Sequence, residues 1–163
     1  MSSKNLSNYD RSQLPDVQTM RIGIVVSEWN NDITDNLLRG AIETLTECGA
    51  SLDHLKIIYV PGSFELPSGA QMLLENTSVE AVITLGCVIR GETPHFDFVC
   101  QTCADGIKDV ALKYKKPVIF GVLTDNTLEQ SRARSGGNLG NKGVEAAVTA
   151  IKMIALQRQL EGF

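Results

Sequence analysis

One stretch establishes the fold class, because it predicts a strand, a helix and a second strand in succession. This stretch is residues 81–123, AVITLGCVIRGETPHFDFVCQTCADGIKDVALKYKKPVIFGVL. Residues 81–88 and 118–123 are nearly all apolar, which is typical of parallel strands covered on both faces. Between these runs, apolar side chains recur every three or four residues, at Phe96, Val99, Cys103, Ile107 and Val110. That spacing places them on one stripe of a helix. The stretch is therefore predicted to form a right-handed β-α-β unit.

The same pattern extends along the chain from this stretch. Two further β-branched runs, residues 22–26 and 57–60, predict two more strands. Helical spacing covers residues 33–45 and 142–155 and, less regularly, residues 64–75. The alternation of strands and helices predicts a three-layer α/β/α sandwich of the flavodoxin-like type. Its four-stranded parallel sheet would carry helices on both faces.

The composition limits both the number of domains and the class of partner. With 163 residues, 43% of them hydrophobic, the chain is long enough for one compact domain and too short for two ordinary ones. Residues 1–16 are mostly polar and predict a flexible arm, which leaves residues 17–163 as one domain. A net charge of −4 argues against nucleic-acid binding. Because no run is apolar enough for a membrane span or a signal peptide, we expect no membrane partner and a cytoplasmic location.

Four cysteines, at positions 48, 87, 100 and 103, are expected to be reduced thiols. Cys100 and Cys103 have C-x-x-C spacing, but they fall inside a predicted helix, with no second cysteine pair and no series of histidines nearby. We expect both side chains to be buried as small hydrophobic groups. The sequence predicts neither a metal nor a cofactor.

Aromatic and polar residues follow the first two predicted strands, where ligands bind in folds of this class. Trp29 follows the first strand, and its indole either stacks on a heteroaromatic ligand or packs over the edge of the sheet. Ser63, Phe64 and Glu65 follow the second strand, after a Pro-Gly turn. Glu65 either caps the helix that begins there or accepts hydrogen bonds from a polyhydroxyl ligand.

The segment after the third strand, GCVIRGETPHFD at residues 86–97, carries the most candidates. Its glycine-containing loop leads into a helix, so free backbone N–H groups and the helix dipole favour an anion such as phosphate. Glu92 must then direct its carboxylate away from the anion. Imidazole can take and return a proton around neutral pH, which makes His95 a candidate for proton transfer. Its position just after a proline is equally compatible with capping or packing.

A second candidate for anion binding follows the fourth strand. Arg132 and Arg134 precede a pair of glycines, and Lys142 lies in the sequence Gly-Asn-Lys-Gly immediately before a predicted helix. Cations beside glycines at a helix start favour an anion pocket. The alternative is a flexible loop with solvated charges. The order G-x-x-x-x-G-K-[ST] of a nucleotide P-loop is not present.

Three motifs together resemble the lumazine synthase family: PGSFE at 61–65, GCVIRGETPHFD at 86–97 and GNKG at 140–143. They occur in the family's order, and the resemblance covers residues 21–160. It implies an enzyme of riboflavin biosynthesis that condenses 5-amino-6-(ribitylamino)uracil with 3,4-dihydroxy-2-butanone 4-phosphate. The product is 6,7-dimethyl-8-ribityllumazine, and the reaction needs no metal and transfers no hydride.

The resemblance also implies roles for particular residues. His95 matches the histidine of proton transfer. The positions that match contacts to the pyrimidine ring and ribityl chain are Trp29, Ser63, Phe64, Glu65, Cys87, Val88, Ile89 and Phe120. The positions that match the phosphate site are Glu92, Thr93, Arg134 and Lys142. Trp29 stands where many members carry phenylalanine, which implies stronger stacking and weak flavin binding as a side property.

The same resemblance implies a homo-oligomer. The pocket would lie between neighbouring subunits of a pentamer, with Phe120 and Arg134 serving a site completed by the next chain. The short link from Arg134 to Gly143 favours assembly of pentamers into an icosahedral shell, and riboflavin synthase is a candidate partner. Two other functions remain open, a non-catalytic lumazine or flavin carrier and a flavodoxin-like electron carrier.

Overall fold

A parallel sheet of four strands forms the centre of the computed structural model, which describes residues 5–162. The strands are β1 (Ile22–Ser27), β2 (Leu55–Val60), β3 (Ala81–Ile89) and β4 (Val118–Asp125). Their order across the sheet is β2-β1-β3-β4, and every neighbouring pair is parallel. The predicted four-stranded parallel sheet is therefore confirmed, and each strand extends the predicted run by one or two residues.

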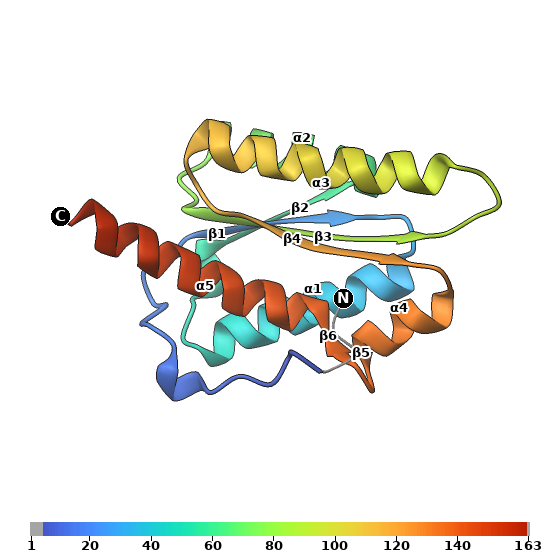
Figure 1. Ribbon diagram of the computed structural model, residues 1–163. Coiled ribbons are helices and arrows are strands. Elements are labelled where there is room, and N and C mark those ends of the chain that lie inside the picture. The colour runs from blue at the N-terminus through green and yellow to red at the C-terminus, as the bar shows by residue number, and fades with distance from the viewer. Residues whose placement is uncertain (1–4, 163) are drawn as a thin grey trace.

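Helices cover both faces of the sheet (Figure 1). α1 (Asn31–Glu47) and α5 (Lys142–Glu161) pack on one face, and α2 (Leu66–Asn76) and α3 (His95–Tyr114) pack on the other. This arrangement confirms the predicted three-layer α/β/α sandwich. Within residues 5–162, no helix combines the length and the apolar character that crossing a bilayer requires.

Several shorter elements were not expected from the sequence. A short helix, α4 (Leu128–Arg134), follows β4 and leads directly into a small antiparallel pair, β5 (Ser135–Gly137) and β6 (Gly140–Asn141). Three single-turn 3-10 helices also occur, η1 (Arg11–Gln13), η2 (Leu52–His54) and η3 (Ser63–Glu65). Helices as short as α4 depend on tertiary packing more than on their own periodicity, so sequence pattern alone does not reveal them.

The central strands carry hydrophobic core on both faces. All of β1 is buried, and successive side chains face opposite layers. Ile24 packs with Leu37 on the α1 and α5 side, and Val25 packs with Leu73 on the α2 and α3 side. The expectation that every apolar run is covered on both faces is wrong for β2, where Tyr59 is 54% exposed. An edge strand has a neighbouring strand on one side only, so the layers cover it less completely.

Part of the predicted N-terminal arm lies against the folded body. The Ser7 hydroxyl accepts a hydrogen bond from the backbone N–H of Asn141 at 2.6 Å and donates one to its carbonyl oxygen at 3.1 Å. Leu14 packs against the core between α1 and α5, and Val17 is fully buried. Residues 1–4 of the predicted arm lie outside the described residues.

Candidate active site

The carboxyl ends of β1, β2 and β3 meet around a cavity of about 520 Å³. In a parallel sheet these ends lie at one edge, so segments far apart in the chain converge there. The cavity brings together the predicted site residues Trp29, Ser63, Phe64, Glu65, Cys87, Val88, Ile89 and His95. It is lined additionally by Asn30 and Val99, which the sequence analysis did not select.

The two aromatic side chains at the mouth of the cavity are open to solvent. Trp29 is 66% exposed and Phe64 is 53% exposed. The Trp29 backbone N–H donates to the Pro61 carbonyl oxygen at 3.1 Å, which fastens the first loop to the turn after β2. A Cβ atom at Gly62 would lie 2.6 Å from the indole, so the absence of a side chain there lets the ring rest against the turn. An indole held in this way presents a flat surface on which a heteroaromatic ring can stack.

Asn30 fixes the loop that carries Trp29. Its backbone is left-handed, with φ of 60°, a conformation that asparagine tolerates better than most residues. Its side-chain amide donates to the carbonyl oxygen of Cys87 at 2.9 Å and so ties the start of α1 to the end of β3. Sequence reasoning missed Asn30 because a single asparagine in a connecting segment forms no pattern of its own.

Ser63 and Glu65 present polar groups to the same cavity. The Ser63 hydroxyl is buried against Gly86 and has no hydrogen-bond partner among the described residues. Buried polar groups are almost always paired, so an unpaired hydroxyl in a cavity wall is suited to a hydroxyl or carbonyl of a ligand. One oxygen of Glu65 accepts a hydrogen bond from the Gly62 N–H at 3.1 Å, as the capping alternative predicted. The second carboxylate oxygen remains suited to a polyhydroxyl ligand, so the two alternatives are compatible.

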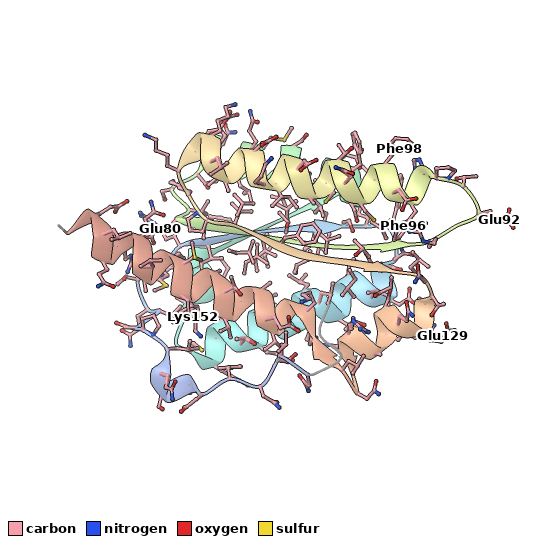
Figure 2. All side chains as sticks on the ribbon, in the orientation of Figure 1. Glu80, Glu92, Phe96, Phe98, Glu129 and Lys152 are labelled. Carbon is pink, nitrogen blue, oxygen red and sulfur yellow. The ribbon has the colours of Figure 1, made fainter. Side chains whose placement is uncertain are left out.

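His95 begins α3 directly after Pro94, and it is exposed at the rim of the cavity. Among residues 5–162, the imidazole has no hydrogen-bond partner in the protein. It is therefore free to contact a ligand, rather than serving as a cap. Thr93 and Glu92 lie in the exposed loop just before it. Figure 2 places Glu92 at the outer tip of this loop with its side chain directed outward, as an anion bound by the loop backbone would require.

Five predicted site residues do not line this cavity: Glu92 and Thr93, which lie in the loop before α3, and Phe120, Arg134 and Lys142. Phe120 lies on the edge strand β4 and is 41% exposed. Arg134 ends α4 and is half-buried. Lys142 begins α5, and its ammonium group forms an ion pair with the carboxylate of Glu145. A single chain therefore leaves Phe120, Arg134 and Lys142 apart from the wall formed by Trp29 and its neighbours.

A buried line of polar side chains supports the cavity wall from behind. The Cys87 thiol donates to the Ser131 hydroxyl at 3.4 Å, and that hydroxyl donates to the Asp125 carboxylate at 3.0 Å. Burial raises the pKa of Cys87 to about 11, and the hydrogen bond with Ser131 only partly offsets it. Cys87 is therefore a neutral thiol at physiological pH. Sequence reasoning missed this chain because its three members come from separate elements.

The two cysteines of the C-x-x-C pair differ in burial. Cys103 is fully buried, and burial raises its pKa to about 12. Cys100 is half-buried, so the expectation that both thiols are buried is met in full only by Cys103. Within residues 5–162, no group of three or more His, Cys, Asp or Glu side chains is placed to hold a metal ion.

Comparison of the sequence with known proteins finds a matching family model and similar relatives. Residues 19–158 match the family model described as 6,7-dimethyl-8-ribityllumazine synthase. The 6,7-dimethyl-8-ribityllumazine synthase of Parabacteroides distasonis is 54% identical over 151 residues, which cover 93% of this chain and 94% of the relative. The enzyme of the same name from Flavobacterium psychrophilum is 52% identical, over 97% of this chain and 84% of the relative. That of Bacteroides fragilis is 52% identical, over 83% and 94% respectively.

Proposed function

Because the chain belongs to the 6,7-dimethyl-8-ribityllumazine synthase family, whose members are enzymes of riboflavin biosynthesis, we propose the specific reaction that it catalyses. It condenses 5-amino-6-(ribitylamino)uracil with 3,4-dihydroxy-2-butanone 4-phosphate to give 6,7-dimethyl-8-ribityllumazine. The observation that carries this proposal is the cavity in which an exposed indole, an unpaired buried hydroxyl and an unpartnered imidazole converge.

The pyrimidine and its ribityl chain fit the wall of this cavity. The ring would stack on Trp29 beside Phe64, against the strand end formed by Cys87, Val88 and Ile89. The ribityl hydroxyls would bond to Ser63 and Glu65, whose hydroxyl and carboxylate border the same space. Stacking combined with a few placed polar groups is the usual composition of a small-molecule pocket.

The ketose phosphate would lie beside the loop that precedes α3. Backbone N–H groups around Glu92 and Thr93 would hold its phosphate, because the start of a long helix favours negative charge. Arg134 would bind the same phosphate through two parallel hydrogen bonds, and Lys142 would add a second positive charge. These contacts orient the ketone toward the amine of the pyrimidine and ease the departure of phosphate.

The chemistry requires positioning and proton transfer. The amine attacks the ketone carbonyl, water and phosphate leave, and the ring closes. Holding both substrates in attack geometry supplies the larger part of the rate increase. His95, at the rim of the cavity, would carry protons between the amine and the departing groups, which contributes about 10²- to 10⁴-fold in typical cases.

Phe120, Arg134 and Lys142 lie outside the cavity wall of their own chain, and we propose that they complete the cavity of a neighbouring subunit. The assembly would be a pentamer, with pentamers joined into an icosahedral shell. Riboflavin synthase would be a partner of that shell in the cytoplasm. Each subunit would contribute residues 17–163 as one domain and residues 1–16 as its arm.

The first experiment follows lumazine absorbance and fluorescence after the purified protein is mixed with both substrates. Product formation supports the proposed reaction. Arg134→Ala should raise KM for the ketose phosphate by roughly 30- to 150-fold, the usual loss of a charged hydrogen-bonded contact. The matched control is Arg132→Ala, because Arg132 lies on the same helix and forms only an exposed ion pair with Asp32. No product, together with tight lumazine or flavin binding, would favour the carrier function instead.

A subunit-mixing experiment tests the shared site. His95→Ala and Arg134→Ala proteins, each weakly active alone, are unfolded, mixed and refolded together. If one chain supplies His95 and its neighbour supplies Arg134, mixed assemblies contain some intact sites and regain activity. Activity no greater than the sum of the two variants would place both residues in one subunit. Light scattering would reveal the shell, and a pentamer-sized particle would contradict it.

A further inference from the structure

The loop of residues 91–94, between β3 and α3, has backbone N–H groups without partners among the described residues. All four of its residues are exposed. Among the described residues, no backbone N–H of residues 91–93 donates a hydrogen bond to the protein, and a Cβ at Gly91 would meet nothing within 4 Å. Unpaired amides suit an anion, but an unsupported loop would adopt many shapes. Its shape must therefore be held by the residues on either side.

Arg90, the residue just before this loop, contacts two residues just after it, Phe96 and Asp97. Its two terminal nitrogens donate to the two carboxylate oxygens of Asp97, at 2.8 and 3.3 Å. Its guanidinium carbon also lies 4.2 Å from the centre of the Phe96 ring. Figure 2 shows Phe96 directed from α3 toward the sheet, opposite to the outward-facing Phe98. The same side chain thus joins the end of β3 to the first turn of α3.

A third segment completes this arrangement. The remaining guanidinium nitrogen, Nε, donates to the side-chain oxygen of Asn126 at 3.0 Å, and the Arg90 backbone N–H donates to the Asp125 carbonyl oxygen at 2.9 Å. Asn126 is itself held, because its N–H donates to the Gln130 side chain at 2.8 Å. Every nitrogen of the guanidinium therefore has a partner within the protein, although the side chain is partly open to solvent.

We propose that Arg90 is a positioning residue that closes residues 91–94 into the shape that binds the substrate phosphate and presents His95, without itself contacting that phosphate. This inference rests on the proposed function, which assigns the phosphate to this loop. A planar guanidinium suits the task because it pairs with a carboxylate through two parallel hydrogen bonds while stacking on an aromatic ring.

The alternative is that Arg90 is a phosphate ligand, and Asp97→Asn distinguishes the two roles. If Arg90 bound phosphate, the loss of the Asp97 charge would release the guanidinium and remove a nearby negative charge, so KM for the ketose phosphate would fall. If Arg90 holds the loop, the same substitution loosens it and KM rises. We expect a rise of roughly two- to fivefold, because the pair is solvent-exposed and its contribution is correspondingly reduced. KM for the pyrimidine should stay within about twofold, because Asp97 is exposed and does not line the cavity proposed for the pyrimidine, and substitutions at such positions have small effects.

The experiment measures KM for each substrate and hydrogen exchange of residues 91–99 in four variants. Arg90→Gln and Asp97→Asn should both raise KM for the ketose phosphate and speed exchange in this segment, chiefly at the hydrogen-bonded amides of Asp97 and Phe98. The double variant Arg90→Asp/Asp97→Arg, in which the two charges are swapped, should recover part of the KM for the ketose phosphate and part of the protection from hydrogen exchange. The control is Asp105→Asn, which weakens an ion pair with Lys108 on the same helix, where the carboxylate side chain is 56% exposed compared with 60% for Asp97.

The outcomes separate this inference from the proposed function. A fall in KM for Asp97→Asn, or effects no larger than those of Asp105→Asn, would overturn the positioning role while the reaction itself stands. If the unmodified protein makes no lumazine, the proposed reaction fails and exchange alone decides about Arg90. Faster exchange of residues 91–99 in both single variants would then support its role in holding the loop, and unchanged exchange would overturn it.

Discussion

At the two ends of the sheet, an arginine pairs with an acid in different surroundings. At the carboxyl end, Arg90 pairs with Asp97, and the side chains are 43% and 60% exposed. At the amino end, Arg158 of α5 pairs with Glu80 just before β3, and the side chains are 38% and 25% exposed. Figure 2 shows Glu80 and Glu92 at these opposite ends. The pairs use the same chemistry, but their neighbours differ.

At the amino end, no buried side-chain nitrogen or oxygen of the described residues lacks a hydrogen-bond partner, whereas the carboxyl end leaves two buried hydroxyls unpaired. Arg158 also donates to the carbonyl oxygen and hydroxyl of Thr19, and the second oxygen of Glu80 accepts the Arg21 N–H. At the carboxyl end, the buried hydroxyls of Ser27 and Ser63 have no partner among the described residues. We infer that the amino end stabilises the fold, whereas the carboxyl end keeps hydrogen-bonding capacity for a ligand.

The largest expected effect concerns the thiol of Cys87 behind the cavity. Because its pKa is raised from 9.0 to about 11, the reactive thiolate is about a hundredfold scarcer near pH 8 than in an ordinary cysteine. Cys87 should therefore react with iodoacetamide at least about a hundredfold more slowly in the folded protein than in denaturant. Peptide mass spectrometry of timed samples measures both rates. Rapid modification of native Cys87 would mean that the carboxyl end opens, and that it is less ordered than the amino end.

A second effect concerns proton transfer at the carboxyl end. His95→Ala should lower kcat by roughly a hundredfold, at the low end of the usual contribution of a proton-transfer group, since orientation of the two substrates survives the substitution. The unfolding temperature should not change, because the imidazole is exposed and has no protein partner among the described residues. Steady-state kinetics and calorimetry test both statements. An unchanged kcat would remove His95 from the mechanism, and a large loss of stability would make it a structural residue instead.

The same contrast explains what could be predicted from sequence. The sheet and its main helices follow from hydrophobic periodicity, and Trp29, Ser63 and Cys87 could be grouped because parallel strands end at one edge. The short helix α4 could not be predicted from the sequence, because packing rather than hydrophobic periodicity stabilises it. Nor could the link from Ser131 to Asp125, since which side chains meet behind β3 depends on how α4 docks.

Asn30 and Arg90 show most clearly what could not be predicted from the sequence. Each is an ordinary polar residue in the sequence, yet Asn30 adopts a left-handed conformation and Arg90 joins three segments. The roles of all the site residues stay predictions, and Phe120, Arg134 and Lys142 in addition lie outside the wall formed by their own chain.

A third effect concerns the close approach of Gly62 to the indole. In Gly62→Ala, the new Cβ would lie 2.6 Å from the Trp29 ring, so the indole must move. We expect KM for the pyrimidine to rise by roughly tenfold, within the usual cost of overpacking, with little change in KM for the ketose phosphate. The control is Gly162→Ala, whose Cβ meets its nearest neighbour at an ordinary 3.5 Å. Equal changes in both KM values would show that the turn supports the whole carboxyl end rather than the stacking surface.

The smallest effect belongs to the amino end and concerns stability alone. Burial raises the pKa of Glu80, but hydrogen bonds from Arg158 and from the Arg21 N–H, together with the two positive charges, outweigh it and hold the pKa below its ordinary 4.5. A carboxyl with a lowered folded pKa stabilises the protein above its unfolded pKa and loses that contribution as the pH falls through the folded value. Glu80→Gln should therefore reduce the free energy of unfolding by about 1 kcal/mol at pH 7.

Below about pH 4.5 the difference should shrink, because the carboxyl of the unfolded chain then binds a proton, and it disappears once the native carboxyl is also neutral at still lower pH. Denaturant unfolding at pH 7 and pH 3.5, with Glu43→Gln as an exposed control, measures both parts. Neither kcat nor KM should change, since Glu80 lies at the end of the sheet away from the cavity (Figure 2). A change in KM would show that the two ends are coupled through the strands. A stability loss that stayed constant with pH would mean that shape, rather than charge, makes Glu80 stabilising.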